Sequence, residues 1–345
     1  MRVLLVGNVF GRELAANFYF TMEKLLHGFA RAGHAVQVFN DRDAARMATP
    51  FRTRKLGAPR ANRRLVRAAA NFRPDLVLLG HCEMIANATV GEIREAVPGV
   101  CVVYRNVDPL HTAWNRELIA RRGPAVDAVF VTTAGAPAAR LETGRTPVYF
   151  MPNPVDPAVE TLRGFTHTDQ AYDLFFAIGS PIDSTDPRVA IAERLAAALP
   201  EVAFDFRGMH GKPAQRGAGY FDLLRNARMG LSFSRVNDHY LYSSGRMAQY
   251  MGNGLLTFLD RATGFGDIFG EDELGFYDDV DELCDKIRHY RANDAERRAV
   301  AERGWKKAHD LFDCRKVADF ITDATFGTGP RHAYAWPTAP QRPPG

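Results

Sequence analysis

Residues 231–257 read LSFSRVNDHYLYSSGRMAQYMGNGLLT. The apolar run at the start predicts a strand that ends near Ser234, and a polar loop follows it. Ser243 or Ser244 can cap the helix that comes next, and Gly252 lies at its end. The Leu-Leu-Thr that closes the stretch begins another apolar strand. Two strands joined through one helix are typical of a parallel sheet.

The same alternation of short apolar strands and helices runs through the whole chain. In the first half, strands are predicted at Val3–Val6, Ala35–Phe39, Leu76–Leu79, Val102–Tyr104, Ala128–Val131 and Val148–Met151. In the second half, they are predicted at Asp173–Ile178, Ala203–Phe206, Met229–Phe233, Leu255–Leu259 and Gly275–Tyr277. Helices are predicted at Asn17–Ala32, Arg188–Ala198, Ser244–Met251, Asp281–Ala292 and Asp294–Leu311. This order indicates an α/β protein with parallel sheets that helices cover on both faces.

The chain divides into two halves of similar size. Its 345 residues exceed the length at which a single core usually stops growing. The alternation pauses at Met151-Pro-Asn-Pro-Val-Asp156, whose prolines favour an extended connector. We therefore predict two Rossmann-like domains, residues 1–153 and 154–327, that face each other across a cleft. Residues 328–345 contain many Pro and Gly and are predicted to form a loose tail.

The composition is that of an ordinary globular protein, with 46% hydrophobic and 24% charged residues. The formal charge of +4 is small for this length, so anion binding needs a local patch. The cysteines form no CxxC pair, which gives a zinc or redox motif little support. The first apolar run is too short for a signal peptide, and no run approaches the roughly 20 residues of a membrane span. We expect a cytoplasmic protein with free thiols.

The helix start near Ser244 suits a diphosphate, because a helix N-terminus offers unpaired N–H groups and a partial positive charge. Arg246 adds a formal charge in the first turn. The alternative is that the serines only cap the helix and that Arg246 is a surface charge. Gly179-Ser180 follows the first strand of this half, where a tight turn would bring backbone N–H groups to phosphates. Arg207 and Gly208 follow the next strand.

Polar side chains also follow the strands of the first half. His81 and Glu83 come after one strand, and Asn106 and Asp108 come after the next. Ligands of open parallel sheets bind at the carboxyl ends of the strands. A carboxylate or histidine there can act as a general base, with Asp108 the first candidate and His81 and Glu83 the next. Asp108 can equally cap a helix that begins at Pro109.

The stretch from Arg246 to Thr257 resembles the helix and following strand of GT-B glycosyltransferases. Its RMAQYMGNG is similar to the Arg-x-Phe-Glu-x-Met-Ala-x-Gly of the CgeB-like branch of spore-maturation proteins. Residues 278–287 and 294–304 resemble the two helices that close the C-terminal domain of that family. The resemblance covers residues 170–325 well and the first half more weakly, through Tyr104-Arg-Asn-Val-Asp-Pro109.

This resemblance implies a GT-B fold whose C-terminal helix returns to the first domain. It implies that the second domain binds a nucleotide-diphosphate sugar through Gly179, Ser180, Arg207, Ser243, Ser244, Arg246 and Gln249. The first domain would bind a glycan or lipid-linked acceptor near His81, Asn106 and Asp108. Many retaining relatives carry two glutamates eight positions apart, whereas Leu241 and Gln249 stand here. Gln249 can hydrogen-bond two hydroxyls without a charge, and the choice between inversion and retention stays open.

Residues 51–67 read FRTRKLGAPRANRRLVR, which is strongly basic and carries a few apolar side chains. Such a segment can rest on an anionic membrane face or hold an anionic acceptor such as a lipid-linked glycan. A solvated helix face is the alternative. No known nucleic-acid motif accompanies the charge, so a nucleic acid is not expected as a partner.

No cofactor beyond the donor and no metal ion is expected. Asp41-Arg-Asp43 is a DxD-like sequence early in the first half, but it is not a convincing metal motif. A helix dipole and arginines would then stabilise the leaving diphosphate, with Lys212 and Arg235 as further candidates. Two alternatives to a transferase stay open. They are a nucleotide-sugar epimerase and an inactive protein that binds sugar nucleotides or glycans.

Overall fold

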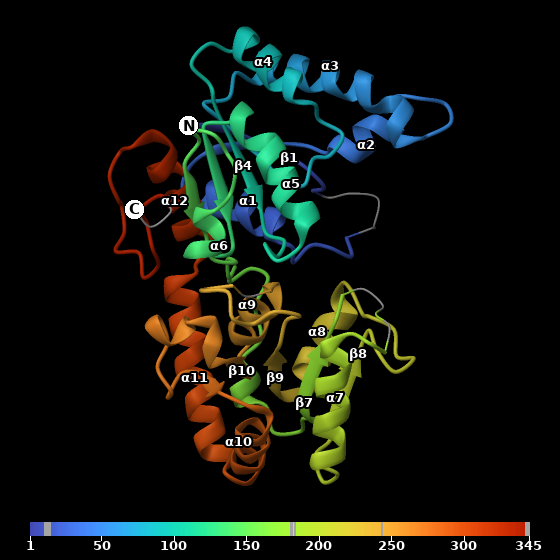
Figure 1. Cartoon of the computed structure of the whole chain (residues 1–345), viewed down its shortest axis with the longest axis vertical. Helices are drawn as coiled ribbons and strands as arrows, with labels where there is room; N and C mark the ends of the chain where they lie inside the picture. Colours follow the sequence, from blue (N-terminus) through green and yellow to red (C-terminus); the bar gives the residue numbers. More distant parts are fainter. Residues whose placement is uncertain (10–14, 180–181, 183, 243, 342–345) are drawn as a thin grey trace. The chain divides into compact units, whose positions relative to one another are not determined.

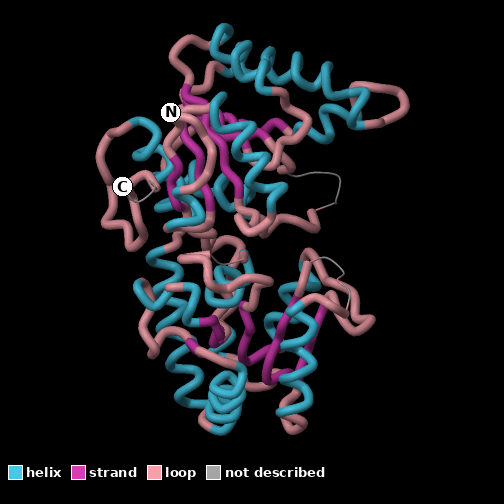
Figure 2. The backbone as a smooth tube through the Cα atoms, in the orientation of Figure 1, coloured by secondary structure: helices cyan, strands magenta, loops and turns pink. Residues whose placement is uncertain are grey.

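The computed structural model describes residues 1–9, 15–179, 182, 184–242 and 244–341. The chain forms two compact units. The first contains Met1–Pro154 together with the chain from Cys314 onward, and the second contains Val155–Asp313. The boundaries predicted from the sequence were residues 153 and 327. Each unit has a parallel sheet with helices on both faces, so the predicted pair of Rossmann-like α/β folds is confirmed (Figures 1 and 2).

The first unit contains a six-stranded sheet in the order β2-β1-β3-β4-β5-β6, and every pair of neighbours is parallel. Its strands are β1 (Arg2–Val6), β2 (Ala35–Phe39), β3 (Leu76–Leu79), β4 (Cys101–Asn106), β5 (Ala128–Val131) and β6 (Val148–Phe150). The near-continuous apolar composition of β1 and β3 agrees with a position buried on both faces.

Six main helices accompany this sheet. They are α1 (Thr21–Arg31), α2 (Asp41–Arg46), α3 (Arg54–Phe72), α4 (Asn87–Ala96), α5 (Ala113–Arg122) and α12 (Cys314–Phe326), with a short α6 (Ala136–Ala139). Side chains of α3, α4 and α5 pack on one face, where Val77, Val102 and Val129 meet them. The opposite face carries α12, whose Phe320 packs edge to face on Phe130 of β5.

The second unit contains five parallel strands in the order β11-β10-β9-β7-β8. They are β7 (Tyr172–Ala177), β8 (Phe204–Arg207), β9 (Ala227–Ser232), β10 (Leu256–Asp260) and β11 (Gly275–Tyr277). The helices are α7 (Pro187–Ala198), α8 (Ala218–Arg225), α9 (Gly245–Gly252), α10 (Val280–Ala292) and α11 (Asp294–Leu311). Leu195 of α7 and Ile287 of α10 pack on one face of the sheet, and Tyr220 of α8 and Tyr250 of α9 contact Phe175 on the other.

The C-terminal helix returns to the first unit, as the resemblance implied. Helix α12 packs along α1, and the two backbones come so close that a Cβ on Gly28 would lie 2.1 Å from the Cys314 carbonyl oxygen. Arg31 also donates to the Cys314 Sγ at 3.2 Å. Within the described residues, no helix is both long and apolar enough to cross a membrane.

The Pro- and Gly-rich tail makes specific contacts as far as residue 341, although the sequence predicted it to be loose. Arg331 forms ion pairs with Asp319 at 2.7 Å and Asp323 at 2.9 Å. Trp336 is buried and packs edge to face on Phe320. Ion pairs and aromatic contacts therefore hold this segment in place, although its Pro- and Gly-rich amino-acid composition predicts no regular structure.

Candidate functional site

Both sheets have a point at which the strand order reverses. It lies between β1 and β3 in the first unit and between β7 and β9 in the second. Loops after the strands diverge at such a point and leave a crevice at the carboxyl ends, where α/β proteins bind ligands. Of the predicted site residues that the structure describes, most follow a strand at these ends, and Ser244, Arg246 and Gln249 belong to α9 and its N-cap.

Ser244 lies at the start of α9, beside the reversal point of the second unit. It is the N-cap residue, but its side chain makes no cap hydrogen bond. Its Oγ is buried and has no hydrogen-bond partner in the described structure. A buried hydroxyl of this kind is costly unless something binds it. The position is therefore suited to an oxyanion ligand at the helix N-terminus. Ser243 and Ser180 lie outside the described residues.

The Arg246 side chain hydrogen-bonds to the ends of two neighbouring strands, β7 and β9. Its Nη1 donates to the Ala177 carbonyl oxygen at 3.0 Å, and its Nη2 donates to the Phe233 carbonyl oxygen at 2.5 Å. The guanidinium also lies over the Phe176 ring, 5.3 Å from its centroid. Burial lowers the pKa of Arg246. No carboxylate of the described residues pairs with it, so its positive charge at the ends of β7 and β9 has no anionic partner.

The other predicted cations of this unit have carboxylate partners. Arg207 donates its Nε to both oxygens of the buried Asp205, at 2.9 and 3.0 Å. Lys212 lies 3.7 Å from the same carboxylate. Arg235 pairs with Asp186 at 2.7 Å. The charges of these side chains are therefore partly compensated within the protein, in contrast to the charge of Arg246.

Three further residues shape this end of the second sheet. Gln249 accepts a hydrogen bond from the Tyr220 hydroxyl at 2.8 Å through its Oε1. Gly179 borders open space, since no atom of the described residues would lie within 4 Å of a Cβ added there. Gly208 has φ +77°, and a Cβ would lie 2.2 Å from the Ile178 carbonyl oxygen, so only glycine fits without a shift.

Leu241 stands eight residues before Gln249, at the position where the resemblance implied a glutamate in many family members. Its side chain is buried, with 1% exposed, and its φ of +54° is uncommon outside glycine. Its backbone N–H donates to the Thr263 carbonyl oxygen at 2.7 Å. This residue therefore has a packing role and offers no polar group to a ligand.

In the first unit the structure brings His81 and Asp108 together. His81 Nε2 lies 3.7 Å from Asp108 Oδ2, after β3 and β4 respectively. The Asp108 backbone N–H donates to Asn106 Oδ1 at 2.8 Å, which fixes the turn after β4. The Asp108 side chain is half exposed and caps no helix, because α5 begins at Ala113. The geometry leaves its carboxylate available to a ligand.

The protonation of this pair is set by burial and by neighbouring charges. Burial lowers the pKa of His81, Arg105 lowers it further, and Asp108 and Glu83 raise it. His81 is therefore neutral near pH 7 and can accept a proton. Burial raises the pKa of Glu83, but hydrogen bonds from Arg42 at 2.9 and 3.0 Å bring it below its usual value. Glu83 is thus held as an ion-paired carboxylate, which makes it a weaker base.

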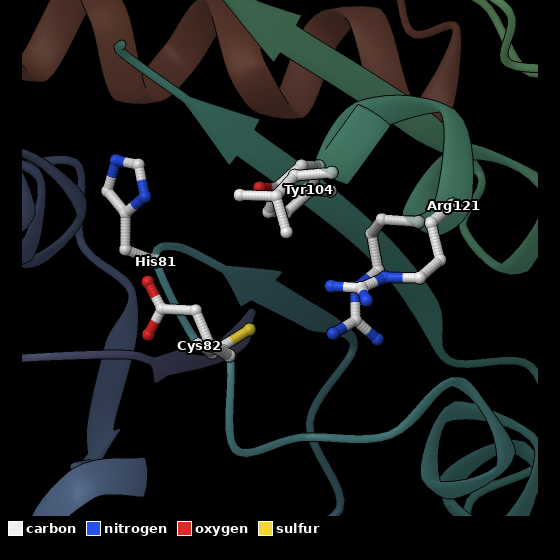
Figure 3. A pocket seen from close by; sticks show the side chains of 7 residues that line it. His81, Cys82, Tyr104 and Arg121 are labelled. Carbon is white, nitrogen blue, oxygen red and sulfur yellow. The ribbon is translucent and has the colours of Figure 1, made fainter. Parts of the chain in front are cut away.

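A small cavity lies beside these residues (Figure 3). Its volume of about 20 Å³ is enough for a single water molecule. It is lined by His81, Cys82, Glu83, Tyr104, Leu118, Arg121 and Arg122. A larger hollow of about 500 Å³ lies at the amino ends of β1 and β3, beside Arg2 and Asp75. That end of a parallel sheet is not where ligands usually bind.

Asp41 and Asp43 of the DxD-like sequence lie in α2. Asp41 is buried and accepts a hydrogen bond from the Met84 N–H at 3.3 Å, and Asp43 pairs with Arg46 at 2.7 Å. Among the residues that the structure describes, no group of three or more His, Cys, Asp or Glu side chains could hold a metal ion.

Arg105 is a residue that sequence reasoning did not single out. It lies in β4 with 2% of its surface exposed, and its Nε and Nη1 are buried without hydrogen-bond partners in the described chain. The sequence does contain a sign of its unusual position, because CVVYRN places a charged residue in a strand that begins with a run of apolar residues. Arginine is rarely fully buried unless it is paired.

Residues 188–323 match the model of the family described as "Glycosyl transferase-like". The matched region extends from α7 into α12 and includes α9. No curated protein matches the chain significantly.

Several solved structures share the fold over nearly the whole chain. HepE from Anabaena, solved in complex with UDP and glucose, is 11% identical with a TM-score of 0.61, over 95% of this chain and 100% of that one. AviGT4, a glycosyltransferase involved in avilamycin A biosynthesis, is 16% identical with a TM-score of 0.57, over 94% and 97%. A putative UDP-N-acetylglucosamine 2-epimerase from Listeria monocytogenes is 12% identical with a TM-score of 0.54, over 96% and 98%. The chain therefore has the GT-B fold.

Proposed function

We propose that this protein is a glycosyltransferase that moves a sugar from a nucleotide-diphosphate sugar to a glycan or lipid-linked acceptor. The observation that carries the proposal is the start of α9, which combines the unbonded hydroxyl of Ser244 with an Arg246 guanidinium that no carboxylate of the described residues pairs with. The family match over residues 188–323 and the resemblance of the α9 region to the CgeB-like branch support it. HepE, which shares the fold, was solved with UDP-glucose.

In this proposal the donor diphosphate binds at the N-terminus of α9. The helix dipole and Arg246 favour the negative charge that develops on the leaving group. Gly179 allows close approach to the end of β7, and Gln249 offers its amide to the ribose hydroxyls. No metal ion is needed for this step, so a chelator is expected to leave turnover unchanged. Loss of activity in EDTA that is restored by a divalent ion would contradict this part of the proposal.

The acceptor binds the first unit, beside His81 and Asp108. A hydroxyl must lose its proton as it attacks the sugar, and these two side chains are the candidate bases. Neutral His81 can accept that proton directly, and Asp108 lies close enough to stabilise the imidazolium that forms. Glu83 is a less suitable base because Arg42 pairs with it.

Two other functions are consistent with parts of the same geometry. The Listeria protein described as a putative epimerase shares the fold, which favours an epimerase as the second candidate. An inactive binding protein is the third, because Leu241 and Gln249 replace acidic residues.

The first test is a thermal-shift screen of the purified protein with UDP, GDP, ADP, CMP and dTDP. One nucleoside diphosphate should raise the melting temperature, and the shift should shrink in Arg246→Gln. The sugar form of that nucleotide is then incubated with the protein, and products are separated. Transfer to an added glycan supports the proposal, whereas a new nucleotide sugar indicates an epimerase. The absence of any shift at millimolar ligand would contradict the donor site.

We also propose that the protein works at the inner face of a membrane and contacts anionic lipid through residues 51–67, the first part of α3 and the turn before it. The sequence between Asp43 and Asp75 contains no acidic residue. Exposed basic side chains cover the first part of α3 and the turn before it, namely Arg52, Arg54, Lys55, Arg60, Arg63, Arg64 and Arg67. Met47, Phe51 and Leu56 are 78%, 77% and 64% exposed around the same turn. Apolar side chains within a basic surface match an anionic bilayer, which attracts each nearby cation by about 1 kcal/mol.

Vesicle sedimentation tests this surface. The protein should bind vesicles of phosphatidylcholine with phosphatidylserine, bind pure phosphatidylcholine weakly, and dissociate in high salt. The triple variant Met47→Ser, Phe51→Ser, Leu56→Ser should lose most of this binding and keep its melting temperature. Trp114→Ser, which removes an exposed aromatic side chain from α5, is the matched control. Equal binding by the triple variant, or binding of nucleic acid in place of vesicles, would contradict the lipid assignment.

A further inference from the structure

Arg105 differs from the other deeply buried arginines of the described chain. Arg297 donates to Asp294 at 2.8 Å and to the Arg228 carbonyl oxygen at 3.1 Å. Arg122 donates to Asn87 at 2.7 Å and to the Ile85 carbonyl oxygen at 2.6 Å. The Nε and Nη1 of Arg105 have no acceptor within the residues that the structure describes. A guanidinium removed from water without a partner is strongly unfavourable, which points to a ligand that supplies the acceptor.

The position of Arg105 in the sheet places it at the candidate site. It is the next-to-last residue of β4, so it lies near the carboxyl end of the strand. Val102 and Tyr104 pack toward α3, α4 and α5, and alternation therefore directs Arg105 to the opposite face. It is in register with Phe130 of β5, which contacts α12 on that face.

The charges around Arg105 link it to His81 and Asp108. Burial lowers the pKa of Arg105 to about 10, and Asp108 and Glu23 raise it, so the guanidinium remains protonated at neutral pH. The same charge lowers the pKa of His81. Across the described residues, neither Asp108 nor Glu23 forms an ion pair with Arg105. The two carboxylates therefore attract the guanidinium electrostatically, but they do not accept its hydrogen bonds.

We propose that Arg105 is the centre of an oxyanion-binding site in the first unit, which holds a phosphate or carboxylate group of the acceptor. The assignment to the acceptor rests on the proposed sugar transfer. The planar guanidinium matches the geometry of both groups through paired N–H donors. An acceptor held in this way presents a neighbouring hydroxyl to His81 and Asp108.

A ligand-binding role predicts an unusual effect on stability. Arg105→Met removes a buried charge that no protein group compensates, so without ligand the variant should melt at the same temperature as the wild type or higher. Arg122→Met is the matched control. It should melt lower, because the Asn87 side chain and the Ile85 carbonyl lose their donor. An Arg105→Met protein that melts as low as Arg122→Met would show a structural role and overturn the proposal.

Calorimetric titration of inorganic phosphate tests binding directly, with chloride used to hold the ionic strength constant. Arg105→Met should weaken phosphate affinity about tenfold or more, and Arg105→Lys should retain part of it because the charge remains. The exposed Arg67→Met should bind as the wild type does. Equal phosphate affinity in Arg105→Met and the wild type would overturn the site.

Titration of UDP separates the two possible sources of the anion. If Arg105→Met loses phosphate affinity but binds UDP normally, the site serves the acceptor. If UDP affinity falls in parallel, the anion is the diphosphate of the donor and the acceptor assignment is wrong. If phosphate binding depends on Arg105 while no nucleoside diphosphate binds the wild type, the proposed function fails and the oxyanion site stands.

Discussion

At the scale of single residues, Ser244 offers a direct test of the donor site. Its hydroxyl makes no hydrogen bond within the described structure, so Ser244→Ala should leave the melting temperature of the free protein unchanged. The same change should weaken UDP binding by about tenfold or more, as expected for one lost hydrogen bond to a charged group. Asp279 is the matched control, because its side chain caps α10 through the Glu282 N–H at 2.8 Å. Asp279→Ala should cost about 1 kcal/mol of stability and leave UDP binding intact.

Asp41 predicts a dependence of stability on pH. Burial raises its pKa from 3.8 to about 6. The folded state therefore favours the protonated form, and the contribution of Asp41 to stability is present below about pH 4 and is lost as the pH rises through 6. At about 1.36 kcal/mol per pH unit, the loss approaches 3 kcal/mol. Asp41→Asn should thus be more stable than the wild type at pH 7, and equally stable near pH 4, in urea unfolding. A stability difference that does not change with pH would contradict this.

Single-residue chemistry was only partly predictable from the sequence. The closeness of His81 and Asp108 followed from their positions after neighbouring strands. The pairing of Arg207 with Asp205 was missed, although residues two apart on a strand share a face. The end of a strand shows where a side chain lies. That the Ser244 hydroxyl and the Arg105 Nε and Nη1 are buried without a hydrogen-bond partner depends on tertiary packing, which no local pattern of sequence shows.

At the scale of elements, the contact between α1 and α12 predicts opposite effects of the same substitution at two helical glycines. Gly28→Ala should destabilise the protein by about 1–3 kcal/mol, because the new Cβ would lie 2.1 Å from the Cys314 carbonyl oxygen. Gly91→Ala in α4 has nothing within 4 Å and should gain about 0.5–1 kcal/mol from helix propensity. Chemical denaturation of both variants measures the difference. A stable Gly28→Ala would show that α12 can move away from α1.

The strands and the helices α1, α7, α9, α10 and α11 were predicted close to their observed ranges because their apolar periods are strong, whereas no ranges were predicted for α3, α4, α5 and α12. Helix α11 was predicted with its observed ends, and β4 was predicted three residues too short because Arg105 and Asn106 do not look like strand interior. Helix α8 was missed, since it is short and Arg216-Gly217 precede it, without the Ser, Thr, Asp or Asn that marks a helix start, as Ser244 does for α9. The order of the strands within each sheet depends on long-range pairing, which a single sequence does not reveal.

At the scale of the whole molecule, the two units should respond differently to a nucleotide. Hydrogen exchange in the presence of UDP should show its largest protection in the second unit, at the end of β7 and the start of α9. The segments after β3 and β4 should change less, because the proposed acceptor is absent. Phosphate added without nucleotide should reverse this pattern. Protection by UDP confined to the first unit would contradict the placement of the donor.

The return of α12 also determines when each unit can mature during protein synthesis. The first unit is discontinuous, because it needs residues 1–154 and the chain from Cys314 onward, whereas residues 155–313 form the second unit alone. A nascent chain emerges from the ribosome N-terminus first, so the second unit has all of its residues before the first unit can be closed. Helix α1 therefore stays without its partner α12 until residues 314–326 have been translated. Products that terminate before Cys314 therefore leave the first unit open, and chaperones and proteases can use its uncovered surface to distinguish them from chains that contain α12.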